Sequence, residues 1–308
     1  MKPLTISILL LFLVVSTTGN AARKNGFDLS NSLIPVEKIL NGGPGRDGIP
    51  SIDRPRFVAA TKADFMRDKD RVMGVNHQGV AKAYPIKILD WHEIVNDRIG
   101  NAQIVVTYCP LCGTGMVFHA SQLGHFGVSG LLYNSDVLLY DRKTKSLWSQ
   151  IMAKAVSGRK RGEELQALPA SHTTWRDWLS RYPDTLVLSQ DTGFRRNYRQ
   201  SPYLGYARTP KLMFDVEHRN GVHRNKELVL GVSLNGEYKA YAFNTLKGHG
   251  RPEFEDELGQ ELITVTWSQS EQTAAVLNKD GAEIPSVIAY WFAWYAFHPD
   301  TEVFAAKQ

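Results

Sequence analysis

The chain has 308 residues, of which 43% are hydrophobic and 22% are charged. This is the composition of an ordinary globular protein, long enough for one large domain or two medium ones. The net charge of +5 arises from 36 basic and 31 acidic residues without a long run of one sign. We therefore do not expect a protein that binds nucleic acid.

The first 21 residues have the pattern of a secretory signal peptide. Lys2 precedes an apolar run from Leu4 to Val15, which is short for a membrane span, and small residues then lead to Ala21. We expect cleavage near Ala21 and a periplasmic or secreted protein that keeps no stable membrane span. An uncleaved anchor is the alternative.

The segment that follows, residues 22–56, is rich in Gly, Pro and Asp. This composition predicts an extended N-terminal arm. We expect the folded body to begin near Phe57.

Three later segments of the chain occur twice in the same order. GVNHQGVAKAY (74–84) matches GVSLNGEYKAY (231–241), and VNDRIGNAQIVVTY (95–108) matches FEDELGQELITVTW (254–267). A W-x-x-W pattern before Pro-Asp-Thr begins at Trp175 and again at Trp291. The first two matches predict strands joined by Gly-containing turns, and the third predicts a short helix with one aromatic face.

We therefore predict an α+β, strand-rich fold of two pseudo-repeated halves, with mostly antiparallel strands and a few short helices. The first copy spans 57–205, with an inserted segment, and the second spans 206–308. The alignment places Ser268 and Glu271 opposite Cys109 and Cys112. Because the scaffold is duplicated and the cysteines are not, a local role in the first copy explains the two thiols better than a requirement of the fold.

Cys109 and Cys112 are the only cysteines of the chain and form one C-P-x-C-G sequence. A bridge across so short a loop restricts the unfolded chain little, so the pair predicts chemistry rather than stabilisation. In a thioredoxin-like enzyme the first Cys would begin a helix. Gly113 and the strand-like sequence after it instead favour a metal-binding turn between two strands.

Further metal ligands are expected close to the cysteines in the sequence. His92 and Glu93 are the first candidates, because they shortly precede the strand that ends at Cys109, and His119 and His125 come next. Thiolates with an imidazole suit copper, zinc or iron, and the spacing does not choose among these metals. A single Cys pair favours a site with one open, catalytic position, although no catalytic residue is assigned.

The inserted segment, from about residue 119 to 168, carries aromatic and polar side chains at strand spacing, and it alternates like a hairpin closed near residues 143–145. One interpretation is a sheet with one solvated face. The other is a substrate-binding wall beside the cysteines, formed by Asn134, Asp136, Asp141, Trp148 and Gln150.

Several long motifs together carry a resemblance: WHEIVND, YCPLCGT, SGLLYNSDVLLYDR, LWSQ and the two W-x-x-W segments. With them the sequence resembles a bacterial family of domains of unknown function, family 3179, over nearly all of the mature chain. The resemblance implies no activity. It implies that the matching positions are family hallmarks, namely His92, Glu93, Cys109, Cys112, Asn134, Asp141, Trp148 and Gln150.

Three functions are compatible with the sequence. The first is a metal-binding protein or metalloenzyme that uses copper, zinc or iron. The second is a thiol–disulfide oxidoreductase with Cys109 as the nucleophile. The third is a ligand-binding module in which a disulfide fixes a turn. In each case the partner would be a small molecule or another protein.

Overall fold

The computed structural model describes residues 22–306, so the expected signal peptide lies outside the described residues. Strands dominate this part of the chain, and its four α-helices have seven residues each. Nearly all neighbouring strands are antiparallel. The prediction of a strand-rich fold with a few short helices is therefore confirmed.

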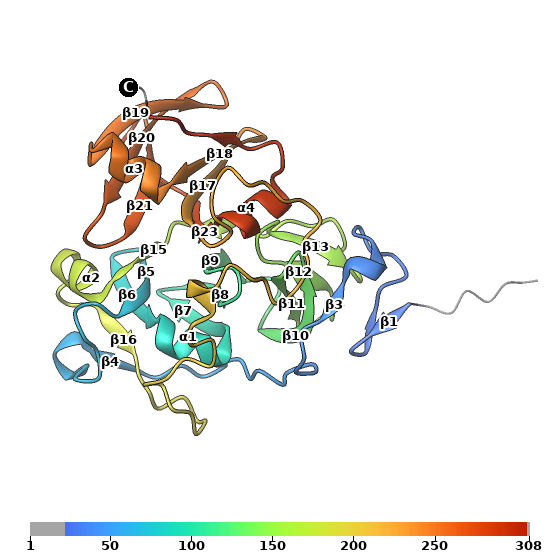
Figure 1. Ribbon diagram of the computed structural model, residues 1–308. Coiled ribbons are helices and arrows are strands. Elements are labelled where there is room, and N and C mark those ends of the chain that lie inside the picture. Colours follow the sequence, from blue (N-terminus) through green and yellow to red (C-terminus); the bar gives the residue numbers. More distant parts are fainter. Residues whose placement is uncertain (1–21, 307–308) are drawn as a thin grey trace, which may run out of the picture.

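Five sheets of four or five strands form the body of the protein and are arranged as the blades of a five-bladed β-propeller. The expected division into two halves needs correction, because the inserted segment supplies four of the five strands of a separate sheet. The sheets have the orders β14-β9-β8-β7, β15-β5-β6-β16-β4, β13-β12-β11-β10-β3, β23-β17-β18-β24 and β19-β20-β21-β22. Figure 1 shows the orange and red sheets of the C-terminal part above the cyan and green sheets that precede them.

The first two of these sheets come from the region that contains the cysteines. Its hairpin turns at Gln78 and Gly79, which both have positive φ, as a two-residue turn between right-twisted strands requires. The elements are β4 (Phe57–Ala59), β5 (Arg71–His77), β6 (Val80–Pro85), α1 (Ile86–His92), β7 (Ile94–Ile99), β8 (Ala102–Cys109), β9 (Thr114–His119), β14 (Ala167–Leu168), β15 (Ser171–Thr174), α2 (Trp175–Arg181) and β16 (Leu186–Leu188).

The C-terminal region repeats the order of elements that the first region shows from β5 onward. Its hairpin turns at Asn235 and Gly236, again with positive φ. The elements are β17 (Leu228–Leu234), β18 (Glu237–Ala242), α3 (Phe243–His249), β19 (Glu253–Leu258), β20 (Glu261–Ser268), β21 (Thr273–Asn278), β22 (Glu283–Ile284), β23 (Ser286–Tyr290), α4 (Trp291–Phe297) and β24 (Glu302–Val303).

The aromatic helices occupy matching places in the two regions. Trp175 and Trp178 of α2 are buried, and so are Trp291 and Trp294 of α4, as the spacing predicts. A Cβ atom added to Gly74 would overlap the ring of Trp178, and a Cβ atom added to Gly231 would overlap that of Trp294. Each glycine therefore lets a tryptophan lie directly on its strand.

The inserted segment forms β10 (Phe126–Tyr133), β11 (Asp136–Asp141), β12 (Leu147–Ser149) and β13 (Lys154–Ser157). Strands β11 and β12 pair on either side of residues 142–146, which confirms the predicted hairpin. A second tight turn, at Asn134 and Ser135, joins β10 to β11. Asn134 is therefore part of a turn and not of a strand, unlike the strand spacing that the sequence predicts for it.

The N-terminal segment belongs to the folded body, which begins before Phe57. It contains β1 (Arg23–Lys24), β2 (Phe27–Asp28) and β3 (Leu40–Asn41), and β3 pairs with β10 of the inserted sheet. Leu29 and Ile39 are completely buried against that sheet. The Gly- and Pro-rich composition predicts irregular backbone but does not show that the few apolar residues pack.

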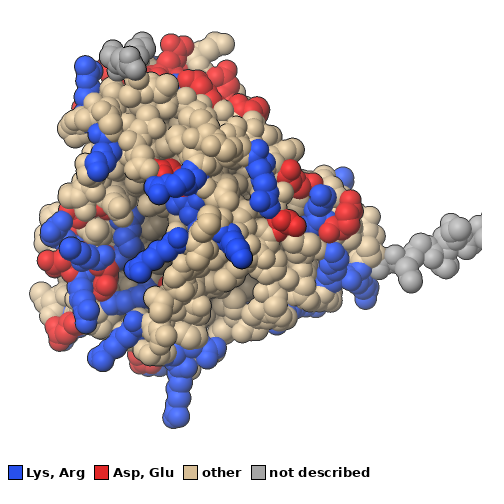
Figure 2. Space-filling view, in the orientation of Figure 1, with Lys and Arg blue, Asp and Glu red and all other residues tan. Residues whose placement is uncertain are grey.

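None of the helices within residues 22–306 is long and apolar enough to cross a membrane. On the face shown in Figure 2, Lys and Arg side chains are interspersed with Asp and Glu. This distribution is typical of a solvated protein surface.

Candidate metal centre

The two cysteines lie on a tight turn between adjacent strands. Strand β8 ends at Cys109, β9 begins at Thr114, and these two residues face each other across the pair. The Cys112 amide donates to the Cys109 carbonyl at 3.2 Å, and Gly113 has φ 65°. No helix begins at Cys109, so the predicted strand–turn–strand is confirmed. Both residues are free thiols, with exposed fractions of 2% for Cys109 and 0% for Cys112.

The turn between β10 and β11 lies against this pair. Asn134 and Ser135 have φ values of 51° and 67°, a conformation that glycine adopts more easily than either residue. Both thiol groups point at the Ser135 carbonyl, with Sγ–O distances of 3.8 Å from Cys109 and 3.3 Å from Cys112. The strained turn thus delivers backbone oxygen to the sulfurs, and the next residue is Asp136.

Asp136 completes a group of three side chains that could hold a metal ion. One carboxylate oxygen of Asp136 and the sulfurs of Cys109 and Cys112 lie within 4.8 Å of one another, and all three residues are buried. The Asp136 Oδ2 accepts from the Ile151 amide at 3.1 Å. The other oxygen, Oδ1, has no hydrogen-bond partner among residues 22–306.

The turn between β10 and β11 also forms hydrogen bonds with the C-terminal part of the chain. The Asn134 side chain donates to the Ala296 carbonyl in α4 at 3.1 Å and accepts from the Glu217 amide at 2.9 Å. The Tyr290 amide donates to the Cys112 carbonyl at 2.8 Å. The centre is therefore enclosed by parts of the chain that are far apart in the sequence.

Glu93 is a second buried carboxyl group beside this centre. It follows α1 with φ 58°, is 6% exposed, and accepts a hydrogen bond from the Tyr203 hydroxyl at 3.2 Å. Burial, together with the neighbouring Asp136 and Asp90 carboxyls, raises the pKa of Glu93 to about 8, although the bond from Tyr203 opposes the shift. Burial likewise raises the pKa of Asp136 to about 7.

Burial also raises the pKa of both thiols, that of Cys112 well above its usual value. The proximity of the two thiols raises the pKa of Cys112 further. Neither cysteine stands at the start of a helix, which is the position that lowers the thiol pKa in thioredoxin-like enzymes. The centre therefore favours protonated thiols unless a cation is present.

His92 and Glu93 are not part of the three-residue group. The His92 ring is already engaged on both sides, with Nδ1 2.7 Å from the Pro50 carbonyl and Nε2 2.7 Å from the Tyr198 hydroxyl. In this arrangement His92 offers no nitrogen to the sulfurs. Burial lowers its pKa, which favours the neutral ring.

The residues expected to form a substrate wall are all buried. Asp141 accepts from the Trp148 indole at 3.0 Å and from Thr144 in its own turn. Gln150 links Thr114 to Thr107 across the cysteine-bearing pair, at 2.6 and 2.7 Å. Asp141, Trp148 and Gln150 thus hold the inserted sheet together and brace β8 and β9, whereas Asp136 reaches the sulfurs.

Two tyrosines near the centre belong to no recognisable sequence motif. Tyr203 bonds to Glu93, and the Tyr206 hydroxyl is buried with no hydrogen-bond partner among the described residues. Both belong to the segment that leads from β16 to β17, whose composition indicates a loop. No pattern in the sequence indicates that this loop packs against the cysteines, as it does in the structure.

The fold and the site define a strand-rich, propeller-like protein with a buried Cys–Cys–Asp group. Residues 46–283 match the model of a family described as "Protein of unknown function (DUF3179)", and the chain belongs to this family. The matched range includes the whole group, and the resemblance expected from the motifs is confirmed. No curated protein and no solved structure matches the chain.

Proposed function

We propose that this protein binds a thiophilic transition metal, namely copper, zinc or iron, through Cys109, Cys112 and Asp136. The convergence of these three buried donors within 4.8 Å carries the proposal. Two thiolates and a carboxylate would fill three positions of a tetrahedral site. The soft sulfur donors favour these metals over magnesium or calcium.

The charge of the centre supports a cation. Four acidic groups lie together, the two thiols and the carboxyls of Asp136 and Glu93, and burial disfavours the charged form of each. The ion pairs found among residues 22–306 include neither carboxyl. A metal ion would displace the thiol protons on binding and would neutralise the anions that this leaves.

The unpartnered polar atoms support the same conclusion. A buried polar atom without a partner costs about 1–3 kcal/mol. Asp136 Oδ1 is such an atom, and the Tyr206 hydroxyl is another. Coordination would satisfy the Asp136 oxygen directly.

Glu93 is the best candidate for the remaining position, either as a ligand or as the acceptor for a metal-bound water. Its carboxyl is buried beside Asp136, and the Tyr203 hydroxyl orients it. The positive φ of Glu93 supports a local role, because glycine is the usual residue at such a helix end and Glu93 adopts this conformation with a buried side chain. His92 is placed outside the ligand set in this proposal.

The oxidoreductase alternative has less support. A redox-active cysteine needs an exposed thiol with a lowered pKa, whereas both thiols here are buried and have raised pKa values.

We further propose that the mature chain begins near Ala22 and acts in the periplasm or outside the cell, as residues 1–21 indicate. N-terminal sequencing of protein from its native compartment tests this. We also propose that the two regions with the same strand order arose by duplication.

Metal analysis of the untagged protein from its native compartment tests the metal proposal. We expect about one equivalent of copper, zinc or iron in the wild type and none in Cys112→Ser or Asp136→Asn. The loss of metal affinity in these two variants should exceed the roughly 10- to 100-fold loss caused by removing a residue that only hydrogen-bonds to a metal ligand. Ser268→Ala is the matched control and should keep the metal.

Cobalt substitution adds a readout that a general loss of folding would not mimic. Thiolate-to-cobalt charge-transfer absorption should appear in the wild type and change in Cys109→Ser. A metal-free wild type with an easily reduced bridge would instead support the oxidoreductase. A metal-free protein with a resistant bridge would support a structural disulfide.

A further inference from the structure

A cavity of about 400 Å³ lies where β9 and the inserted sheet meet the C-terminal region. This volume is within the range of small-molecule sites. Gly115, Met116 and Val117 line it from β9, residues 151–154 from the inserted segment, and Trp294 and His298 from the C-terminal region. The cavity is separate from the cysteines, which do not line it.

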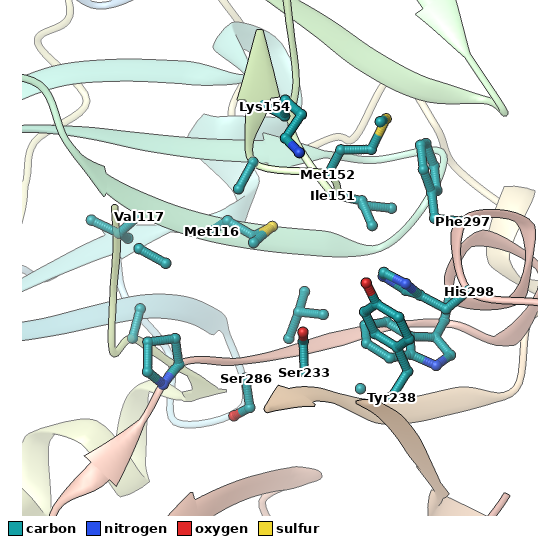
Figure 3. A pocket seen from close by; sticks show the side chains of 18 of the residues that line it. Met116, Val117, Ile151, Met152, Lys154, Ser233, Tyr238, Ser286, Phe297 and His298 are labelled. Atoms are coloured by element: carbon teal, nitrogen blue, oxygen red, sulfur yellow. The ribbon is translucent and has the colours of Figure 1, made fainter. Parts of the chain in front are cut away.

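One wall of the cavity is a cluster of three aromatic rings. The His298 ring is stacked on Tyr238, with ring centroids 4.1 Å apart, and lies tilted against Trp294 at 4.2 Å. In the first region the equivalent cluster has two rings, Tyr182 and Trp178, because Ala81 stands where Tyr238 stands here. Figure 3 shows Tyr238 and His298 beneath the space that Ile151 and Met152 border from above.

The opposite wall combines adaptable apolar groups with one cation. Met116 and Met152 have flexible thioether side chains that adapt to a ligand. Lys154 directs its amino group towards the cavity (Figure 3). Its partner Glu164, at 2.9 Å, has a side chain that is 71% exposed. Such an exposed pair is weak, so the ammonium group remains able to bind an anion.

We infer that this cavity binds a small aromatic anion. The ring system lies against Tyr238 and His298, where aromatic stacking is favourable. The anionic group, a carboxylate or sulfonate, lies at Lys154. Burial lowers the pKa of His298 to about 4, so its ring is neutral at physiological pH and leaves Lys154 as the cation that binds the anion.

Two fluorescent probes test the inference on the full mature chain. 1-Anilinonaphthalene-8-sulfonate has the aromatic body and the anionic group, and N-phenyl-1-naphthylamine has the body alone. Lys154→Gln should weaken the sulfonate about tenfold, the equivalent of about 1.4 kcal/mol, and leave the neutral probe unchanged. Lys160→Gln is the matched control, because Lys160 is also partly exposed and paired with a glutamate, and it should change neither probe.

Tyr238→Ala, which copies the first region, should weaken both probes by roughly 3- to 10-fold. Met152→Trp should fill the cavity and prevent binding of both. Circular dichroism confirms that each variant is folded. The inference is overturned if the wild type binds neither probe, or if sulfonate binding is the same in wild type, Lys154→Gln and Tyr238→Ala. Ile151 contacts Asp136 and also lines the cavity. The titrations are therefore repeated with and without metal, which separates an effect of the metal on the cavity from the effect of each substitution.

Discussion

The turn from β8 to β9 and the turn from β20 to β21 have the same backbone pattern but opposite chemical surroundings. Cys109 faces Thr114 across one pair, and Ser268 faces Thr273 across the other. Gly113 and Gln272, which occupy the same place in the two turns, both have positive φ. The backbone of the two turns therefore does not explain why one turn carries cysteines and the other does not.

The two turns differ in the charged groups that lie around them. Glu271, in the place of Cys112, binds Thr174 and the cation Arg176. Cys112 instead faces the Ser135 carbonyl and the Asp136 carboxyl. The second turn carries an anion that is paired with a cation, whereas Asp136 beside the first turn has no ion-pair partner among the described residues. The inserted sheet makes this difference, because it supplies Asp136.

The same comparison separates His92 from Glu93. The last residue of α1 is His92 and that of α3 is His249, so both helices end in a histidine. The next residue is Glu93 in one case and Gly250 in the other, and both have positive φ. Glycine is the usual residue at such a helix end. The histidine thus belongs to the shared scaffold, and the strained glutamate is specific to the region with the cysteines.

The largest effect that the comparison predicts is on the two buried glycines. Gly74→Ala and Gly231→Ala should each lower the free energy of unfolding by about 3 kcal/mol, because the added methyl group overlaps a buried tryptophan ring. Urea denaturation measures this effect. Gly221→Ala, where the methyl group meets open space, should be nearly neutral. If only one of the two variants is destabilised, the tryptophans do not pack alike.

A pH-dependent difference of up to about 3 kcal/mol is expected from His298, since one pKa unit corresponds to about 1.4 kcal/mol. Burial lowers its pKa from 6.5 to about 4, although Asp300 opposes the shift. Between these pH values the unfolded chain binds a proton that the folded protein does not, so stability falls as the pH falls from 6.5 to 4. Above pH 6.5 the group contributes no slope.

His298→Phe keeps a ring on Trp294, as Tyr182 does on Trp178, and removes the titration. Urea denaturation at several pH values should show a smaller loss of stability in this variant than in the wild type between pH 6.5 and 4. Equal losses in the two proteins would show that His298 is readily protonated in the folded state.

Exchange of the helix-end residues should change stability by about 1 kcal/mol in opposite directions. Gly250→Glu destabilises, because a side chain there has open space but a strained φ. Glu93→Gly relieves that strain and removes a buried carboxyl group, so the metal-free protein should become more stable. If Glu93→Gly is instead destabilised without metal, the glutamate serves the fold and the argument for a local chemical role fails.

The sequence predicted those features that depend on local patterns. Alternating apolar residues and Gly-containing turns indicated the hairpins, and the spacing of Trp175 and Trp178 indicated a buried helix face. The Cys-Pro-x-Cys-Gly spacing indicated a turn between strands. Each of these signals lies within a dozen residues.

The centre itself depends on contacts that sequence neighbours do not encode. Asp136 reaches the sulfurs because the tip of the inserted hairpin folds back on the cysteine turn, which spacing along the chain does not show. His92 was favoured because it lies close to Cys109 in the sequence, but its ring turns to Pro50 and Tyr198. Glu93, its neighbour, lies beside Asp136. Which of two adjacent residues faces a site depends on helix rotation and tertiary packing.

The smallest expected effect tests whether a cysteine pair on this turn is sufficient to bind metal. The double variant Ser268→Cys, Glu271→Cys places a second cysteine pair on the same strand–turn–strand scaffold. It should gain no stoichiometric metal, because the second region has no inserted sheet to bring a carboxylate, and because Arg176 would lie beside the new thiols. Metal analysis of this variant in the Cys109→Ser, Cys112→Ser background measures the transplanted pair alone. A full equivalent of tightly held metal there would show that the turn is sufficient, and Asp136 would lose its proposed role as a required ligand.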